Sequence, residues 1–459
     1  MKHSKTYQSR WRIAFSLLAI TLVLSLGIVH FLGNSTTTHA AGTQSKPFFM
    51  DFKGESYRFA QSGTKPPTDK QCRSQFGFPC YSPQEMRKAY GLDALLNKGF
   101  DGTGQTIIII DSFGSPTIAS DLHTFDMGYG LPDPPSFKVL APLGTKPFDP
   151  NNGTMVGWAF ETSLDVEWAH SMAPGANIIL MTSPKAETQG IEGMPQFLSL
   201  EKFALDHQLG NIISQSWATT ENTLFFSEGR EVFNSFNDFY KRAGATGVTV
   251  FSSTGDSGVS NPNFHGKFYP FPTVNFPASS PFVTAVGGTS LMADIHGNYQ
   301  SEKGWQGSGG GVSQTFAEPD YQKNNLNSSD QKLLDGFRGI PDIAYNADPN
   351  TSILIFASFI QGNAGFFAIG GTSEGSPQWA GLIADADQLA GHGLGLINAS
   401  LYKIGNSSKA ESSYHDITKG NNGNGGLPGF NCTPGWDPVT GWGTPQASTL
   451  LEELVNMQK

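Results

Sequence analysis

The stretch QTIIIID, residues 105–111, decides the fold class. Its apolar run is unbroken, whereas a strand with one face in water alternates apolar and polar residues. Gly102 and Gly104 lie just before the run and indicate a turn. We therefore predict that residues 105–111 form a central strand, buried on both faces of a parallel sheet.

Similar runs recur and alternate with stretches typical of helices. The strand-like runs are residues 177–181, 211–214, 248–252 and 282–286, and the helix-like stretches are 160–173 and 231–243. Ser82, with Glu85 three residues later, predicts a capped helix through Leu96, because a serine oxygen accepts from the free amides of a first turn. The alternation predicts an α/β fold with a mainly parallel central sheet.

Length and charge limit the function classes. The chain has 459 residues, enough for one large domain with extensions or for two ordinary domains. Residues 1–41 hold four of the 29 basic residues and no acid, which leaves 25 basic against 39 acidic residues in the rest. Nucleic acid is therefore not an expected partner. An acidic surface also loses net charge as the pH falls, which limits self-repulsion in acid.

The first 41 residues have the order of a secretory signal. Basic residues as far as Arg12 precede an apolar run, 13–32, and Ala40 and Ala41 are the predicted cleavage points. At about 20 residues, the apolar run is also long enough to remain as a membrane anchor. We expect a secreted protein that meets a membrane only through this segment, if the segment is kept.

Residues 42–81 read as a polar, irregular leader or linker arm ahead of a domain at 82–459. In an exported chain, Cys72 and Cys80 predict a small disulfide loop, and further zinc ligands at suitable spacing are missing. We expect the remaining Cys432 to be a buried, small apolar residue rather than a reactive thiol.

The stretch GGTSEGSPQWAG, residues 370–381, contains a candidate nucleophile, Ser373. It lies between an apolar run at 366–369, which predicts a short strand, and a helix predicted over 379–389. A serine at such a turn stands clear of the sheet, with helix amides directed at the group it attacks. The same letters satisfy the G-x-S-x-G pattern of α/β-hydrolases, and an ordinary loop remains an alternative.

Three carboxylates could serve that serine. Glu161 and Asp165 lie four residues apart on a predicted helix, so they share one face, and two adjacent acids can hold one proton between them. Asp256 follows a predicted strand, at the sheet edge where α/β folds place ligands. The ordinary alternatives are a solvated helix face for the pair and a turn for Asp256. His170 fits a core histidine.

These stretches together resemble the sedolisin family, the serine-carboxyl peptidases with a subtilisin-like fold. The resemblance runs from about Ser82 to Leu454. It is carried by ETSLD followed by WAHSMAPGA, and by SQSWA, SSTGDSG, SGGGVS, RGIPDIAYNADP, GGTS, HDITKGNNG and PGWDPVTGWGTP, in the family's order.

The resemblance implies a three-layer subtilisin-like fold and a secreted, monomeric endopeptidase acting at acid pH on proteins or peptides. It implies Ser373 as nucleophile, Glu161 as general base, Asp165 as the acid that orients Glu161, and Asp256 as the oxyanion-hole donor. Asp111 stands where subtilisins keep a triad aspartate, a place that is not catalytic in sedolisins. We expect Ser216, Trp217 and Gly255 to line the substrate cleft.

The family also binds one calcium ion. The resemblance implies the side chains of Asp416 and Asp437 and the carbonyls of Ile417, Thr433 and Gly435 as its ligands. Carboxylate and carbonyl oxygens are the ligands that Ca²⁺ prefers. Turn-forming aspartates are the alternative at Asp416 and Asp437.

Two features depart from the family pattern, and three other functions remain alternatives. Family precursors usually carry a long prosegment, whereas about 40 residues separate the predicted signal from the domain here, and Thr433 replaces a common glycine. A subtilisin-type protease needs a histidine where Glu161 stands. An α/β-hydrolase needs a later histidine, for which His392 and His415 are available. A catalytically silent exported binding protein is the third rival.

Overall fold

The isoleucine run forms β4 (Thr106–Ser112), near the middle of an eight-stranded sheet. The computed structural model describes residues 49–52, 55–187, 191–360 and 362–457. The sheet has the order β12-β11-β9-β7-β4-β6-β5, with β15 also paired to β11, and all of these strands are parallel except β12. Its other strands are β5 (Phe137–Leu140), β6 (Asn177–Ser183), β7 (Ile212–Gln215), β9 (Thr249–Ser253), β11 (Thr284–Ala293), β12 (Tyr299–Gly304) and β15 (Ile343–Asn346).

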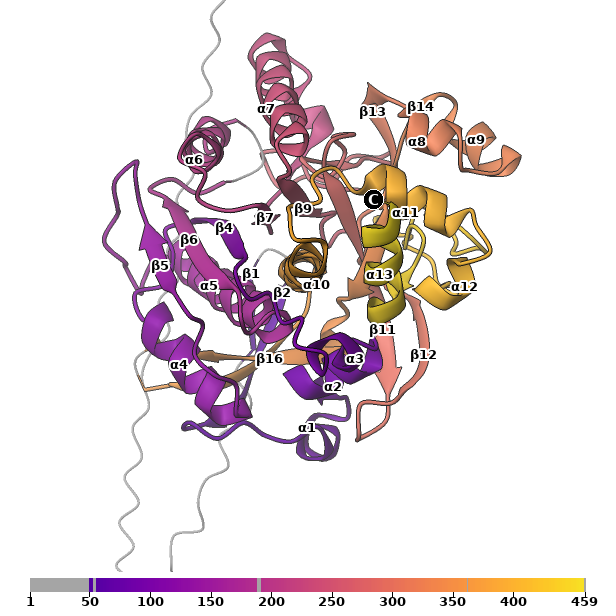
Figure 1. The fold of residues 1–459 in the computed structure, drawn as a ribbon. Coiled ribbons are helices and arrows are strands. Elements are labelled where there is room, and N and C mark those ends of the chain that lie inside the picture. The colour runs from indigo at the N-terminus through magenta and orange to yellow at the C-terminus, as the bar shows by residue number, and fades with distance from the viewer. Residues whose placement is uncertain (1–48, 53–54, 188–190, 361, 458–459) are drawn as a thin grey trace, which may run out of the picture. The chain divides into compact units, whose positions relative to one another are not determined.

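Helices cover both faces of this sheet, as Figure 1 shows. Ile107 and Ile109 join one hydrophobic cluster with α5 and α10, whereas Ile108 and Ile110 join another with α6 and α7. Alternate side chains of a strand point to opposite faces, so the unbroken apolar run serves two cores. The helices on the first face are α4 (Ile118–Tyr129), α5 (Gly153–Met172), α10 (Gly375–Ala390) and α13 (Ala447–Met457), and those on the second are α6 (Met194–Asp206) and α7 (Ser227–Ala245).

The predicted α/β class with a mainly parallel sheet is confirmed, as are the five predicted strands and the helices at 160–173, 231–243 and 379–389. The helix predicted from Ser82 to Leu96 is two helices, α2 (Pro83–Ala89) and α3 (Asp93–Leu96). Ser82 and Glu85 form the expected reciprocal cap, but Gly91 between the helices has a φ of +70°, which a helix does not allow.

A second sheet of five strands has the order β1-β2-β17-β16-β3. Its strands are β1 (Phe49–Phe52), β2 (Glu55–Ser62), β3 (Cys80–Tyr81), β16 (Ser352–Ala357) and β17 (Gly365–Ile369). β17 is the strand predicted at 366–369, yet it pairs antiparallel with β16 and β2. The irregular arm expected over 42–81 is therefore wrong for residues 55–81, because β2, α1 (Asp69–Phe76) and β3 build structure with β16 and β17.

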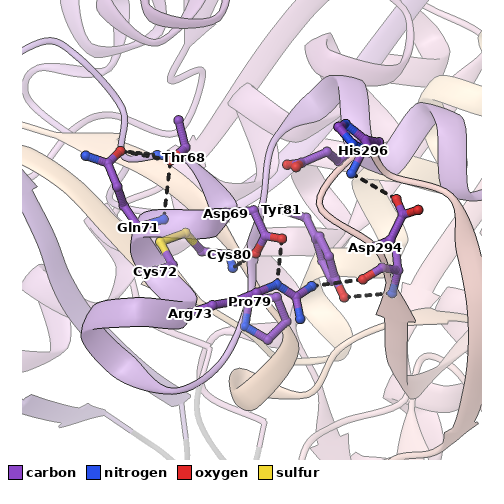
Figure 2. A network of polar contacts seen from close by, with 12 residues as sticks. Thr68, Asp69, Gln71, Cys72, Arg73, Pro79, Cys80, Tyr81, Asp294 and His296 are labelled. Atoms are coloured by element: carbon purple, nitrogen blue, oxygen red, sulfur yellow. Dashed lines mark hydrogen bonds and ion pairs between the residues drawn. A yellow bond between two sulfur atoms is a disulfide. The ribbon is translucent and has the colours of Figure 1, made fainter.

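The predicted disulfide joins Cys72 and Cys80, and a polar network around it ties α1 to β11 (Figure 2). Asp69 accepts from Arg73 Nε at 2.7 Å, and Arg73 Nη2 donates to the Ala293 carbonyl at 2.9 Å. The Tyr81 hydroxyl accepts from Ala293 N at 3.0 Å. Cys432 is free and 6% exposed, as expected for a buried apolar residue.

Shorter elements complete the described chain. They are β8 (Thr219–Thr220), β10 (Asn275–Phe276), β13 (Gly311–Ala317), β14 (Phe337–Ile340), β18 (Tyr414–His415), β19 (Thr444–Pro445), α8 (Asp320–Lys323), α9 (Ser328–Leu334), α11 (Asn398–Gly405) and α12 (Ala410–Ser413), with 3-10 turns at Glu221–Leu224, Pro349–Thr351 and Thr372–Glu374.

The described residues belong to one unit, Pro47–Lys459. Within them, no helix is both long and apolar enough to cross a bilayer. The predicted signal or anchor at 1–41 lies outside the described residues, so its cleavage stays a prediction.

Candidate active site

A cleft of about 920 Å³ opens where β7 and β9 end. The turn after β7 contributes Ser216 and Trp217, and the turn after β9 contributes Gly255 and Asp256. The carboxyl ends of parallel strands meet at one edge of a sheet, which brings segments distant in sequence to one cleft. All three residues expected to meet substrate, Ser216, Trp217 and Gly255, line it.

Helix α5 supplies Glu161 to the cleft wall. The helix is capped by Asn152, whose side chain accepts from Met155 N, and 17 of its 20 residues are buried. Glu161 is 5% exposed and Asp165 is fully buried. A solvated helix face therefore does not explain this carboxylate pair.

Ser216 links α5 to the turn that carries the candidate nucleophile. Its Oγ lies 2.8 Å from Asp165 Oδ1, to which it donates, and 3.4 Å from the Ser373 carbonyl oxygen. Asp165 itself does not line the cleft, and Ser216 connects it to the cleft wall. Ser216 thus has a structural contact beyond the substrate contact that we expected.

Ser373 lies in the 3-10 turn between β17 and α10, as the sequence pattern predicted. It lines the cleft and is 4% exposed. Gly371, two residues earlier, has a φ of +137°, and a Cβ at that position would lie 2.8 Å from Asp256 Oδ2. A glycine is needed there because any side chain would meet both backbone strain and this oxygen.

Asp256 is half-buried and also lines the cleft. Its Oδ1 accepts from the Thr372 backbone N at 2.7 Å and from Thr372 Oγ1 at 2.9 Å. Burial raises the pKa of Asp256 above its usual range, while the two Thr372 hydrogen bonds act in the opposite direction. The carboxyl group thus keeps its proton to a higher pH than an exposed aspartate does.

Several cleft residues were missed from the sequence. Trp158 lies one helical turn before Glu161, so the helical period offered a signal for it. Glu187, Phe264 and Phe268 line the cleft from irregular segments, for which no periodic pattern exists. Phe264 is 64% exposed, so it forms an apolar lip on the cleft.

Asp111 lies near the end of β4 and is fully buried. Burial raises the pKa of its carboxyl group to about 7. Since Asp111 does not line the cleft, it makes no direct contact with a ligand bound there.

Histidines take no part in the cleft wall: none of the described residues that line it is a histidine. His170 is fully buried, with Nε2 2.7 Å from the Pro132 carbonyl oxygen, as a core histidine should be. The ring of His415 stacks on Tyr299 at 3.9 Å, and exposed His392 contacts the Gly393 carbonyl. The histidine-dependent rivals therefore find no support here.

The residues of the predicted calcium site surround one loop. Asp416 accepts from Gly435 N at 3.2 and 3.1 Å, and Asp437 Oδ2 accepts from Thr433 N at 3.3 Å. Burial raises the pKa of Asp437 to about 7 and also raises that of Asp416. Neither carboxylate has an ion pair among the described residues. Ile417 is buried against this loop with Cys432.

Comparisons with known proteins agree on one family, although no protein-family model matches the chain. Kumamolisin from Bacillus sp. (strain MN-32) is 33% identical over 395 residues, which cover 84% of this chain and 66% of kumamolisin. Sedolisin from Pseudomonas sp. (strain 101) is 37% identical over 225 residues, 46% of this chain and 35% of sedolisin. Tripeptidyl-peptidase 1 from Homo sapiens is 28% identical over 456 residues, 93% of this chain and 75% of that protein. The chain thus spans just under two thirds of kumamolisin and about a third of sedolisin.

Among solved structures, Pseudomonas sedolisin, a serine-carboxyl proteinase complexed with two molecules of pseudo-iodotyrostatin, superposes with a TM-score of 0.68 at 27% identity. The match covers 83% of this chain and 100% of that one. A lanthipeptide protease, at 15% identity and a TM-score of 0.50, shares the fold alone. The subtilisin-like fold predicted from the motifs is confirmed, and the chain belongs to the sedolisin family.

Proposed function

We propose that the chain is a secreted serine endopeptidase that cleaves protein or peptide substrates at acid pH. One observation carries the proposal: Ser373, Glu161 and Asp256 line the same cleft. Asp165 lies behind the cleft wall and accepts a hydrogen bond from Ser216. These are the four positions that the family resemblance assigns to catalysis.

Ser373, Glu161 and Asp256 each take part in a step of this proposal. Ser373 Oγ attacks the carbonyl carbon of the scissile bond, and its proton passes to Glu161. The carbonyl oxygen gains negative charge and accepts a hydrogen bond from protonated Asp256. The C–N bond then breaks, Glu161 returns the proton to the leaving amine, and water hydrolyses the acyl-enzyme by the same route.

The acid pH dependence follows from Asp256. A carboxylate accepts hydrogen bonds and cannot donate one, so the oxyanion loses this donor when Asp256 ionises. Burial supports the proposal because it keeps Asp256 protonated above the usual range of an aspartate. Activity should be present below the pKa of Asp256 in the folded protein and disappear as the pH rises through it.

The test combines an activity assay with a covalent label. Denatured haemoglobin digestion should peak below about pH 5.5, where carboxyl groups still hold protons. A serine-directed acyl-enzyme reagent at acid pH should modify Ser373, located by mass spectrometry, and Ser373→Ala is the matched control. A mildly alkaline optimum would favour a subtilisin-type enzyme, and a folded protein without label or activity would favour the silent binding protein.

We also propose that Ca²⁺ binds at the loop shared by Asp416 and Asp437. The residues fit because two carboxylates without counter-charges converge there, and the carbonyls of Ile417, Thr433 and Gly435 are oxygen ligands of the kind Ca²⁺ accepts. No group of three or more His, Cys, Asp or Glu among the described residues could hold a metal, so a cation here needs those carbonyls. When bound, the ion would neutralise the carboxylates and hold the loop.

Removal of calcium should destabilise the protein, because a ligand that binds only the folded state stabilises it by mass action, by about 2.7 kcal/mol at 100 times Kd. Excess chelator should lower the Tm of Ser373→Ala, a background that prevents self-digestion. Asp416→Asn should lose most of that response. An unchanged melting curve, with no metal found in purified protein, would contradict the site.

A further inference from the structure

Thr372, the residue before the nucleophile, contacts Asp256 twice. Its backbone N–H and its side-chain Oγ1 both lie within hydrogen-bond distance of Oδ1, at 2.7 and 2.9 Å. The sequence pattern gave no reason to single out this threonine, and the proposed mechanism assigns it no step. Thr372 is 1% exposed, so its hydroxyl is shielded from water.

A third hydrogen bond fixes the direction of the hydroxyl proton. Gly255 N donates to Thr372 Oγ1 at 2.9 Å, so this oxygen already acts as an acceptor. The hydroxyl has one hydrogen of its own, and Asp256 Oδ1 is the acceptor that lies in reach. Oδ1 therefore receives two donors, the Thr372 N–H and the Thr372 O–H.

The other oxygen of Asp256 has a different neighbour. Oδ2 lies beside Gly371, at the place that a Cβ would crowd. An oxygen that accepts two hydrogen bonds is stabilised as the carbonyl oxygen of a protonated carboxyl group, which leaves the proton for the second oxygen. The glycine keeps the space beside that second oxygen open.

We propose that Thr372 is a positioning residue that makes Oδ1 of Asp256 an acceptor and so assigns the catalytic proton to Oδ2. This inference rests on the proposed function, in which Asp256 donates to the oxyanion. A wrongly placed proton would leave the donor turned away from the substrate, so Thr372 should affect turnover more than substrate binding.

Thr372 should also set the pH at which the donor is lost. Its two hydrogen bonds stabilise the ionised carboxylate, whereas burial opposes it. The other titratable groups that line the cleft are Glu161 from α5 and Glu187 after β6. Both are acids, so their ionisation works in the same direction as burial.

The test compares Thr372→Val with Thr372→Ser. Valine keeps the backbone donor and nearly the same shape but removes the hydroxyl, whereas serine keeps the hydroxyl. In Thr372→Val, kcat should fall about 10-fold with KM little changed, and the alkaline limb of the pH profile should move upward by about one pH unit. Thr372→Ser should keep the wild-type limb. Thr372→Ala replaces Thr372→Val if valine does not fold.

The proposal and the function on which it rests fail differently. Wild type without acid activity, or Asp256→Ala with full turnover, would overturn the proposed function. If Asp256→Ala loses turnover but folded Thr372→Val keeps the wild-type limb and kcat, the role of Thr372 is wrong. In an Asp256→Asn background, Thr372→Val should move the limb no further, and an added upward shift would also overturn the proposal.

Discussion

A carboxyl group whose pKa is raised by burial lies at the cleft, and another lies beside the second sheet, but only the first of these two lines the cleft. Burial raises the pKa of Asp256 at the cleft. Burial likewise raises the pKa of Asp126 to about 8, on α4, a helix that packs against β16 of the second sheet. Asp126 is fully buried and contacts His170, with Nε2 3.4 Å from Oδ2.

The difference teaches that a raised pKa does not identify a catalytic acid. Desolvation raises the pKa of any buried carboxyl group, wherever it lies. Asp256 differs from Asp126 in its contact with the cleft and in its link through Thr372 to the turn that carries Ser373. Variants at the cleft should therefore change rate and its pH dependence, and variants at the second sheet should change stability alone.

The largest effect is expected at Asp256. Asp256→Ala removes an oxyanion donor, which typically costs about 10²- to 10³-fold in kcat, with little change in Tm. Asp256→Asn keeps a neutral donor of similar shape that does not ionise. Its activity should fall less, and its alkaline limb should move upward until Glu161 and Asp165 become limiting.

Pre-steady-state and pH-rate measurements on both variants, with circular dichroism for the fold, check this prediction. Full turnover in Asp256→Ala, or loss of folding as its only defect, would make Asp256 a structural turn aspartate. Asp256 and Asp126 would then both be structural carboxyl groups, and the two regions would not differ in catalysis.

The disulfide should give the next largest effect, on stability alone. Cys72 and Cys80 are eight residues apart, and a loop of this size is stabilised by about 2 to 3 kcal/mol on cross-linking. Replacing both by alanine in the Ser373→Ala background should lower the free energy of unfolding by that amount, measured with denaturant. In the active background the pH profile should stay in place at temperatures where the variant is folded. A displaced pH profile would show that the second sheet affects catalysis in the cleft.

Five strands of the main sheet were predictable because each contains a short apolar run, so local pattern and final position agree. The edge strand β12 is largely polar and exposed, and it gave no such signal. The second sheet lacked this property: β2 and β17 are paired although about 300 residues of chain separate them. Residues 55–81 read as irregular because their order depends on that distant strand and on Arg73, which donates to Asp69 and to the Ala293 carbonyl of β11.

The candidate site, like the fold, has a part that the sequence predicted and a part that it did not. Ser373, Glu161, Asp165 and Asp256 lie in motifs that the family resemblance picks out. The structure brings Ser373, Glu161 and Asp256 to one cleft and connects Asp165 to it through Ser216. Thr372 was in the same motif, but its role depends on hydrogen bonds from Gly255 and to Asp256, which lie 117 and 116 residues away in sequence. Such contacts have no counterpart in periodicity or composition.

Between pH 6.5 and 8, the smallest effect is expected from Asp126→Asn, because one titrating group changes stability by at most about 1.4 kcal/mol per pH unit. The folded-state pKa of Asp126 is raised to about 8, so its stabilising effect is present below about pH 4 and lost as the pH rises to 8. His170 has the opposite shift, to about 4, and its contribution is present above about pH 6.5 and lost as the pH falls. Together the pair holds one proton between about pH 4 and 8, so its two contributions cancel up to about pH 6.5 and stability then falls.

Asparagine keeps the shape without ionising. Between pH 6.5 and 8 the variant should therefore gain up to about 2 kcal/mol relative to the parent, measured by denaturant unfolding in the Ser373→Ala background. The pH profile of the active enzyme should not move, because Asp126 does not line the cleft. A stability difference that stays constant across this window would mean that Asp126 is ionised in the folded protein. Burial would then raise the pKa of the carboxyl group at the cleft but not that of Asp126, and the two regions would differ in this respect too.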